Sequence, residues 1–134
     1  MEQSIRCGVD IAKIVFQIHG VNAKSGETIM VKKLARNEML RYFANKPPML
    51  IGIEACSGSH YWARELTKLG HTVKLMTPQY VAPYRRGGKN DANDAEAICE
   101  ALARPNMRFV AVKSESQQAV LVMHRMRDQW VRER

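Results

Sequence analysis

The stretch "MLIGIEACSGSHYWARELTKLGHTVKLMT" (49–77) decides the fold. Its first part, 49–55, is a short apolar run of the kind that forms a strand covered on both faces. Residues 60–70 then repeat large apolar side chains at helical spacing and end at Gly70, a common helix terminator. Residues 71–77 again have a composition typical of a strand. A strand, a helix and a second strand in this order predict two parallel strands joined by a right-handed crossover.

Upstream of this stretch, the sequence predicts three antiparallel strands. "IRCGVDIA" (5–12) alternates apolar and polar residues, and "KIVFQIHGV" (13–21) continues with β-branched and aromatic residues. Residues 22–26 predict a turn into "ETIMVKKL" (27–34). A helix is predicted over 35–46, where a pair of prolines follows.

Downstream, residues 78–90 are rich in proline and glycine and predict a loop with one short turn at most. A helix is predicted over 91–103, and 108–112 reads either as a last strand or as an extended connector. From Ser114 onward the chain is predicted to be helical, with a heptad seam at Ala119, Met123, Met126 and Trp130. The predicted fold class is therefore α/β: a mixed five-stranded sheet, made of a three-strand meander followed by alternating strands and helices, with flanking helices.

The composition indicates one domain with an anionic partner. The chain has 134 residues, with 21 Lys and Arg against 13 Asp and Glu, for a formal charge of +8. A positive field of this size favours binding to a polyanion such as nucleic acid. No apolar run approaches the roughly 20 residues of a membrane span, and the amino terminus lacks the order of a signal peptide, so a cytoplasmic protein is expected. The three cysteines are far apart and are expected to be free thiols.

Four acidic residues fall at the ends of predicted elements. Asp10 lies near the end of the first strand, and Glu54 ends the strand over 49–54. In open α/β sheets ligands gather beyond the carboxyl ends of the strands, so these two acids converge if their strands are neighbours. Asp91 and Asp94 begin a helix, and a spacing of three places them roughly 60° apart around its axis. One ion can therefore face both aspartates.

Clustered carboxylates repel one another and bind hard divalent cations through oxygen. Two such ions about 3.5 to 4 Å apart can activate a water or a terminal hydroxyl and stabilise the leaving oxygen in phosphodiester cleavage. Structural roles remain open: Asp91 and Asp94 also suit a helix start with Asn90 as its cap, and Asp10 also suits a turn.

Just before the paired aspartates, a glycine-containing loop carries Arg85, Arg86 and Lys89. Cations beside a proposed metal site are expected to contact the phosphates of a nucleic acid. A merely solvated loop is the alternative.

Three motifs carry a resemblance to a known family. "GVDIAK" (8–13), "IGIEACSGSHYWAREL" (51–66) and "KNDANDAEAICEALAR" (89–104) together resemble the amino-terminal domain of DEDD-type insertion-sequence transposases. The domain of that family is similar to the Holliday-junction resolvase RuvC and has a ribonuclease H-like fold. The resemblance implies that Asp10, Glu54, Asp91 and Asp94 are the four metal-binding catalytic acids. We therefore expect two Mg²⁺ ions, with Mn²⁺ as the alternative, and Asp10 as the ligand that bridges them.

The resemblance also implies a division of the chain and a set of partners. Residues 1–112 would form the RuvC-like domain and 113–134 the start of a helical coiled-coil segment, while the serine-containing carboxy-terminal domain of full-length relatives is absent. We therefore expect a fragment with little activity alone, taken from an enzyme that cleaves and exchanges DNA strands as an element moves. The implied partners are DNA, a guide RNA encoded by the element and a second copy or higher oligomer, in the nucleoid-associated cytoplasm of a prokaryote.

Three rival interpretations stay open. One is a RuvC-like structure-specific nuclease, and another is a non-catalytic module for nucleic-acid binding or oligomerisation, whose acids are structural. The third arises because "GVDIAK" (8–13) also resembles the first phosphate loop of actin-like sugar kinases. Such kinases need a second half of the same fold, and this chain lacks the length for it.

Overall fold

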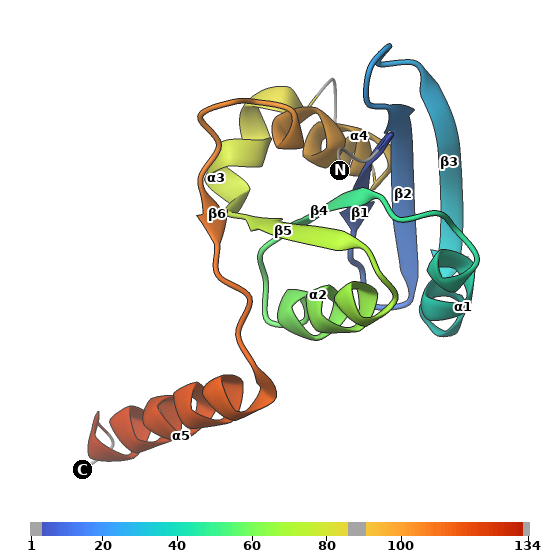
Figure 1. Ribbon diagram of the computed structural model, residues 1–134. Helices are drawn as coiled ribbons and strands as arrows, with labels where there is room; N and C mark the ends of the chain where they lie inside the picture. Colours follow the sequence, from blue (N-terminus) through green and yellow to red (C-terminus); the bar gives the residue numbers. More distant parts are fainter. Residues whose placement is uncertain (1–3, 86–90, 133–134) are drawn as a thin grey trace.

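A six-stranded mixed sheet forms the centre of the computed structural model, which describes residues 4–85 and 91–132. Figure 1 shows the sheet between layers of helices. The five predicted strands are all present, and the ambiguous stretch 108–112 contributes a sixth of two residues. The strands, in spatial order β3-β2-β1-β4-β5-β6, are β1 Ile5–Asp10, β2 Val15–Asn22, β3 Thr28–Ala35, β4 Leu50–Glu54, β5 Thr72–Met76 and β6 Phe109–Val110.

The pairing of the strands confirms the predicted meander and crossover. β1 pairs antiparallel with β2, and β2 with β3, whereas β4 runs parallel to both β1 and β5. In the β1–β4 ladder Val9 lies opposite Ile53. The residues that follow are Asp10 and Glu54, so the two predicted acids end neighbouring parallel strands at the same edge of the sheet.

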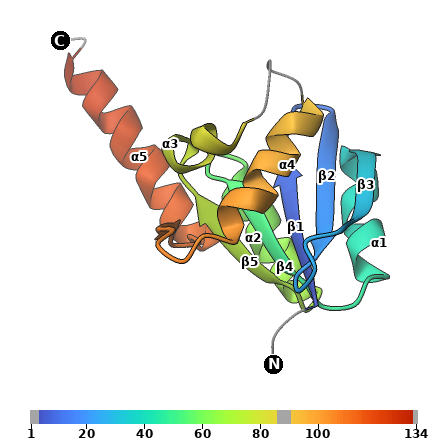
Figure 2. The ribbon, with the colours of Figure 1, turned by 90° about the horizontal axis from the view of Figure 1, so that it is seen from above.

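Helices cover both faces of the sheet (Figures 1 and 2). α1 (Met39–Ala44), preceded by the 3₁₀ turn η1 (Arg36–Glu38), and α2 (Ser59–Lys68) lie on one face. α4 (Asp91–Leu102) lies on the other, across β1, β2 and β4. The loop predicted over 78–90 instead begins with two short helices, α3 (Pro78–Val81) and η2 (Ala82–Tyr84). Pro78 occupies the first turn of α3, where the missing N–H of proline costs no hydrogen bond.

Each face of the sheet has its own apolar layer. The larger cluster joins β1, β2, β4 and β5 to α1 and α2 and includes Phe16 and Trp62, whose rings meet edge to face with centroids 5.1 Å apart. The smaller cluster joins Met76 and Val81 to the inner side of α4. Trp62, one of the apolar side chains at helical spacing in 60–70, is only 4% exposed and lies in the core. All three cysteines are free thiols, as predicted.

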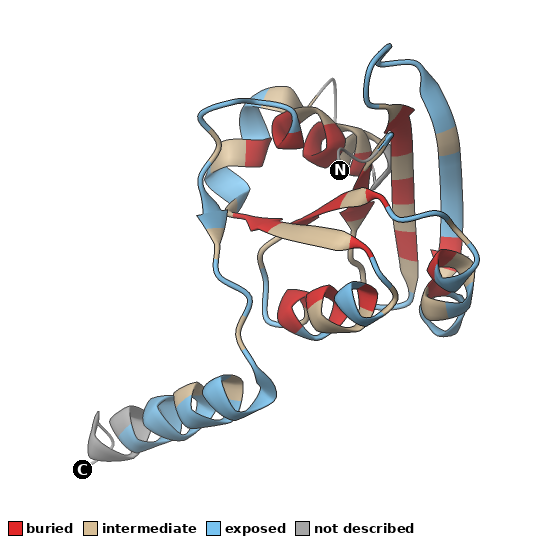
Figure 3. Cartoon of the chain, viewed as in Figure 1, coloured by how far each residue is buried: buried red, intermediate tan, exposed pale blue. Residues whose placement is uncertain are grey.

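The last helix, α5 (Glu115–Arg132), extends away from the sheet (Figure 3). Its first turn is attached to α2, because Nη1 of Arg64 donates hydrogen bonds to the carbonyl of Lys113 and to Oε1 of Gln118. Farther along α5, Met123 and Met126 of the predicted seam are exposed. The side chain of Trp130 lies outside the described residues, and the coiled coil stays a prediction. None of the helices in the described ranges is both long and apolar enough to cross a membrane.

Candidate metal centre

Two glycines show which way the ends of β1 and β4 face. A Cβ added to Gly8 would collide with the backbone of α4, and one added to Gly52 would press against Leu102 of the same helix. Side chains two residues apart point to the same face of a strand. Asp10 and Glu54, which follow these glycines by two positions, therefore project on the side of the sheet that α4 covers.

Gly8 also sets how closely α4 approaches the sheet. Its missing side chain leaves space for the Ala95 carbonyl and for the Cys99 amide nitrogen, which would lie 2.5 Å from a Cβ at this position. Arg6 holds the same contact, because its Nε donates a hydrogen bond of 3.1 Å to the Cys99 carbonyl. Since Asp94 directly precedes Ala95, the close packing places it near the ends of β1 and β4.

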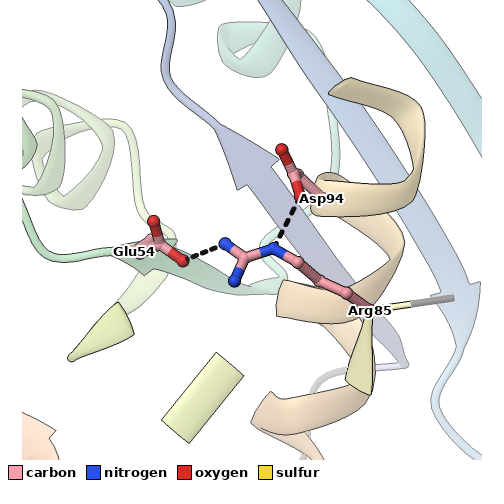
Figure 4. A network of polar contacts seen from close by, with 3 residues as sticks. All are labelled: Glu54, Arg85 and Asp94. Atoms are coloured by element: carbon pink, nitrogen blue, oxygen red, sulfur yellow. Dashed lines mark hydrogen bonds and ion pairs between the residues drawn. The ribbon is translucent and has the colours of Figure 1, made fainter. Parts of the chain in front are cut away.

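Arg85 links two of the predicted acids. Its Nη2 lies 2.7 Å from Oε2 of Glu54, and its Nε lies 2.7 Å from Oδ1 of Asp94 (Figure 4). The three side chains are about one-quarter exposed, at 27%, 26% and 22% for Arg85, Glu54 and Asp94. The hydrogen bond to Asp94, with the charges of both acids, raises the pKa of the Arg85 guanidinium against the opposing effect of burial. One positive group is thus shared by carboxylates from β4 and α4.

The structure brings Glu54 and Asp94 together and ends β1 at a half-buried Asp10 on the same side of the sheet. Asp91 is the first residue of α4, but its side chain lies outside the described residues. Arg86 and Lys89 also fall outside them. Arg85, which the sequence predicts to contact a nucleic-acid phosphate, pairs with two acids in the structure, and the phosphate contact stays a prediction. No local sequence pattern predicts these ion pairs, because they form only when the folded chain brings the segment after η2 next to β4 and α4.

The donor set at this edge suits a hard cation. Carboxylate oxygens are the preferred ligands of Mg²⁺ and Mn²⁺, and Glu54 and Asp94 already converge on the charge of Arg85. Within the described residues, no three His, Cys, Asp or Glu side chains are arranged to hold a metal ion. Glu54 and Asp94 are the two acids that the structure brings together at the candidate centre. Asp10 ends β1, the strand that pairs with β4.

The family model and the relatives that match the chain are all described as transposases. The model of the DEDD transposase family of IS110, described as "Transposase", matches residues 7–134. The "Putative transposase y4pF/y4sB" of Sinorhizobium fredii is 54% identical over 134 residues, which cover 100% of this chain and 34% of that protein. The "Transposase for insertion sequence element IS1328" of Yersinia enterocolitica is 46% identical over 127 residues, which cover 95% of this chain and 38% of that protein. The chain thus spans a little over a third of the relatives it matches.

A solved structure supports the fold. The chain is similar to "T. thermophilus RuvC in complex with Holliday junction substrate", with a TM-score of 0.55 over 79% of this chain and 99% of that chain. The two sequences are 11% identical, so the likeness concerns the fold alone. It confirms the RuvC-like, ribonuclease H-like architecture that the resemblance implied.

Proposed function

Because the chain belongs to the IS110 family of DEDD transposases, we propose that it is the metal-binding part of the enzyme that cleaves and exchanges DNA strands when the element moves. The observation that carries the proposal is the convergence of Glu54 and Asp94, from different elements, on one cationic group. Two carboxylates are held close together at the carboxyl edge of the sheet, where their mutual repulsion favours a bound cation.

In this proposal Asp10, Glu54, Asp91 and Asp94 hold two divalent ions, Mg²⁺ or Mn²⁺. The ions would supply the activation of a water or terminal hydroxyl and the stabilisation of the leaving oxygen. Asp10 and Glu54 contribute from rigid strand ends, and the paired aspartates contribute from the start of α4. The contact of Gly8 with α4 keeps the two sources of carboxylate at a constant separation.

Arg85 has two successive partners in this proposal. Before the centre is loaded, its guanidinium neutralises Glu54 and Asp94. With the two acids neutralised by bound divalent ions instead, the guanidinium would be free to pair with a phosphate of the DNA backbone, for which its planar fork is well suited. Arg86 and Lys89, which follow in the sequence, are proposed to contact phosphates as well.

The remaining assignments follow from the family. Relatives are transposases, and the RuvC structure is described as a complex with a Holliday junction substrate. We extend DNA binding to this chain, together with a guide RNA encoded by the element, a prokaryotic cytoplasmic location at the nucleoid, and self-association. In this scheme residues 1–112 form the catalytic domain and α5 begins the coiled-coil segment at 113–134. The chain alone is expected to have little activity.

The test is strand processing in a full-length transposase that contains this domain. Asp10→Ala and Asp94→Ala should each abolish Mg²⁺-dependent cleavage of the element ends while the circular dichroism spectrum stays unchanged. Glu100→Ala is the matched control, because Glu100 is an acid of the same helix that pairs with Arg104 away from the site. If either aspartate variant processed DNA like Glu100→Ala, the assignment of the site would be wrong.

A further inference from the structure

A second feature lies at the same edge of the sheet, on the face opposite α4. It is an open hollow of about 610 Å³, lined by residues from the β1–β2 turn, from the end of β3 with the following η1, and from the first turn of α2. We call it the α2 hollow and define it by Lys13, Ile14, Arg36, Tyr61 and Trp62. The metal proposal uses none of these residues.

The connections of the chain place the α2 hollow beside the candidate metal centre. Lys13 and Ile14 follow β1, which ends at Asp10. Arg36 follows β3, which runs parallel to β1 because both are antiparallel to β2. The first turn of α2 is reached within five residues of Glu54, since the helix begins at Ser59. A strand of nucleic acid at the acids can therefore pass around the sheet edge into the hollow.

The chemistry of the α2 hollow combines aromatic surface with positive charge. Among the described side chains that line it, Lys13 and Arg36 are the charged ones, and none is acidic. The guanidinium carbon of Arg36 lies 5.5 Å from the centroid of the Trp62 ring. Tyr61 packs edge to face against the same indole, with centroids 5.1 Å apart, and remains 41% exposed. The hollow thus combines an accessible aromatic ring with two cations.

Trp62, which lines the hollow, carries an unused hydrogen-bond donor. Its indole Nε1 is buried and has no hydrogen-bond partner within the part of the chain that the structure describes. Buried indole N–H groups ordinarily find an acceptor. One residue that lines the hollow therefore carries a donor that the described fold leaves without an acceptor.

We propose that the α2 hollow binds an unpaired nucleotide of the nucleic acid that the metal centre processes. Its base stacks on Tyr61, and its flanking phosphates pair with Lys13 and Arg36. Aromatic rings interleaved with cations are how proteins hold single strands without reading their sequence, because every base has a flat face to stack. This inference rests on the proposed function for the class of ligand, but it requires no metal.

Binding of single strands in EDTA tests the proposal apart from the metal centre. Short fluorescein-labelled oligothymidylate and oligouridylate are titrated with the chain at low salt, and anisotropy is followed. Tyr61→Ala should weaken binding about tenfold, from the loss of one stacked base. Lys13→Ala should weaken it less and lower the slope of log affinity against log salt by about one. Comparison of the two oligonucleotides shows whether DNA or RNA is preferred.

Two variants serve as matched controls. Phe109→Ala removes an aromatic ring that is 43% exposed, much like Tyr61, but lies on β6. Lys24→Ala removes an exposed lysine in the β2–β3 turn, at the opposite end of the sheet. Both should bind oligonucleotides like the wild type. Because every titration is carried out in EDTA, a failure of the metal proposal would leave this result untouched.

A spectroscopic readout follows the hollow directly. The sequence has two tryptophans, so Trp130→Phe leaves Trp62 as the single tryptophan reporter. Oligothymidylate should quench its fluorescence in that background, and Tyr61→Ala should remove the quenching. Three outcomes would overturn the proposal: hollow variants that bind like their controls, equal competition by duplex and single strand, or hollow variants that change only self-association in sedimentation. The last outcome would identify a protein contact instead.

Discussion

Nε of Arg85 lies 2.7 Å from Oδ1 of Asp94. This contact attaches the segment after η2 to the first turn of α4, and the same guanidinium reaches Glu54 on β4. Removal of the positive charge would leave Glu54 and Asp94 without the cation that they share. Replacement of Arg85 is therefore a direct way to measure how strongly this edge of the sheet attracts a cation.

Arg85→Ala should therefore bind Mn²⁺ more tightly than the wild type, by roughly tenfold, because an ion no longer has to displace two partly exposed ion pairs of at most about 1 kcal/mol each. Isothermal titration calorimetry of the chain measures this directly. Arg104→Ala is the control for net charge, because Arg104 pairs with Glu100 farther along α4. Affinity that is unchanged or weaker in Arg85→Ala would show that the guanidinium does not compete with the ion.

Gly8→Ala should loosen α4 from the sheet, because the added methyl would meet the backbone at Ala95 and Cys99. Overpacking of this kind costs about 1–3 kcal/mol in the free energy of unfolding. Gly58→Ala should change it by less than about 0.5 kcal/mol, since a Cβ there meets open space and the residue has a negative φ. Urea unfolding compares the two, and equal midpoints would contradict the close approach of α4 described above.

His60 should make the stability of the domain depend on pH. Burial, with the positive charges of Lys113 and Arg64, lowers the pKa of the His60 imidazole, and its Nδ1 accepts a hydrogen bond of 3.0 Å from the Lys113 backbone N–H. The unfolded chain therefore takes up the proton first as pH falls. The contribution of His60 is fully present above the unfolded pKa of about 6.5 and is lost as pH falls through the lower folded value.

Urea unfolding between about pH 7.5 and about pH 5.5 measures this dependence. His60→Asn, which keeps an acceptor oxygen and does not titrate, should lose less free energy of unfolding over this range than the wild type. His124→Asn, at an exposed position of α5, is the matched control and should follow the wild type. Identical pH profiles for all three proteins would rule out a contribution from His60.

Sequence periodicity predicted the framework of the fold because its strands and helices bury regular faces. The alternation in 5–12 and the apolar run in 49–55 were enough to place Asp10 and Glu54 at strand ends, and the parallel pairing of β1 with β4 confirmed that they are neighbours. Strand β6 was ambiguous because two residues, Phe109 and Val110, carry no period.

Features that depend on tertiary approach were not predictable from local patterns. Gly8 reads as an ordinary polar-face residue of a strand, yet its role is to admit the backbone of α4 from far along the sequence. Arg85 reads as a loop cation, and only the folded chain brings it between Glu54 and Asp94. The α2 hollow is assembled from Lys13, Arg36 and Tyr61, which belong to three separate segments.

The most direct test of the metal centre is calorimetric titration of the chain with Mn²⁺, beside Asp10→Asn and Asp94→Asn. These substitutions keep the size of each side chain and remove its charge, and circular dichroism verifies that the fold is retained. The proposed metal centre predicts saturable binding by the wild type and a large loss of affinity in both variants. Indistinguishable titrations for the three proteins would contradict it and would leave these aspartates with a purely structural role.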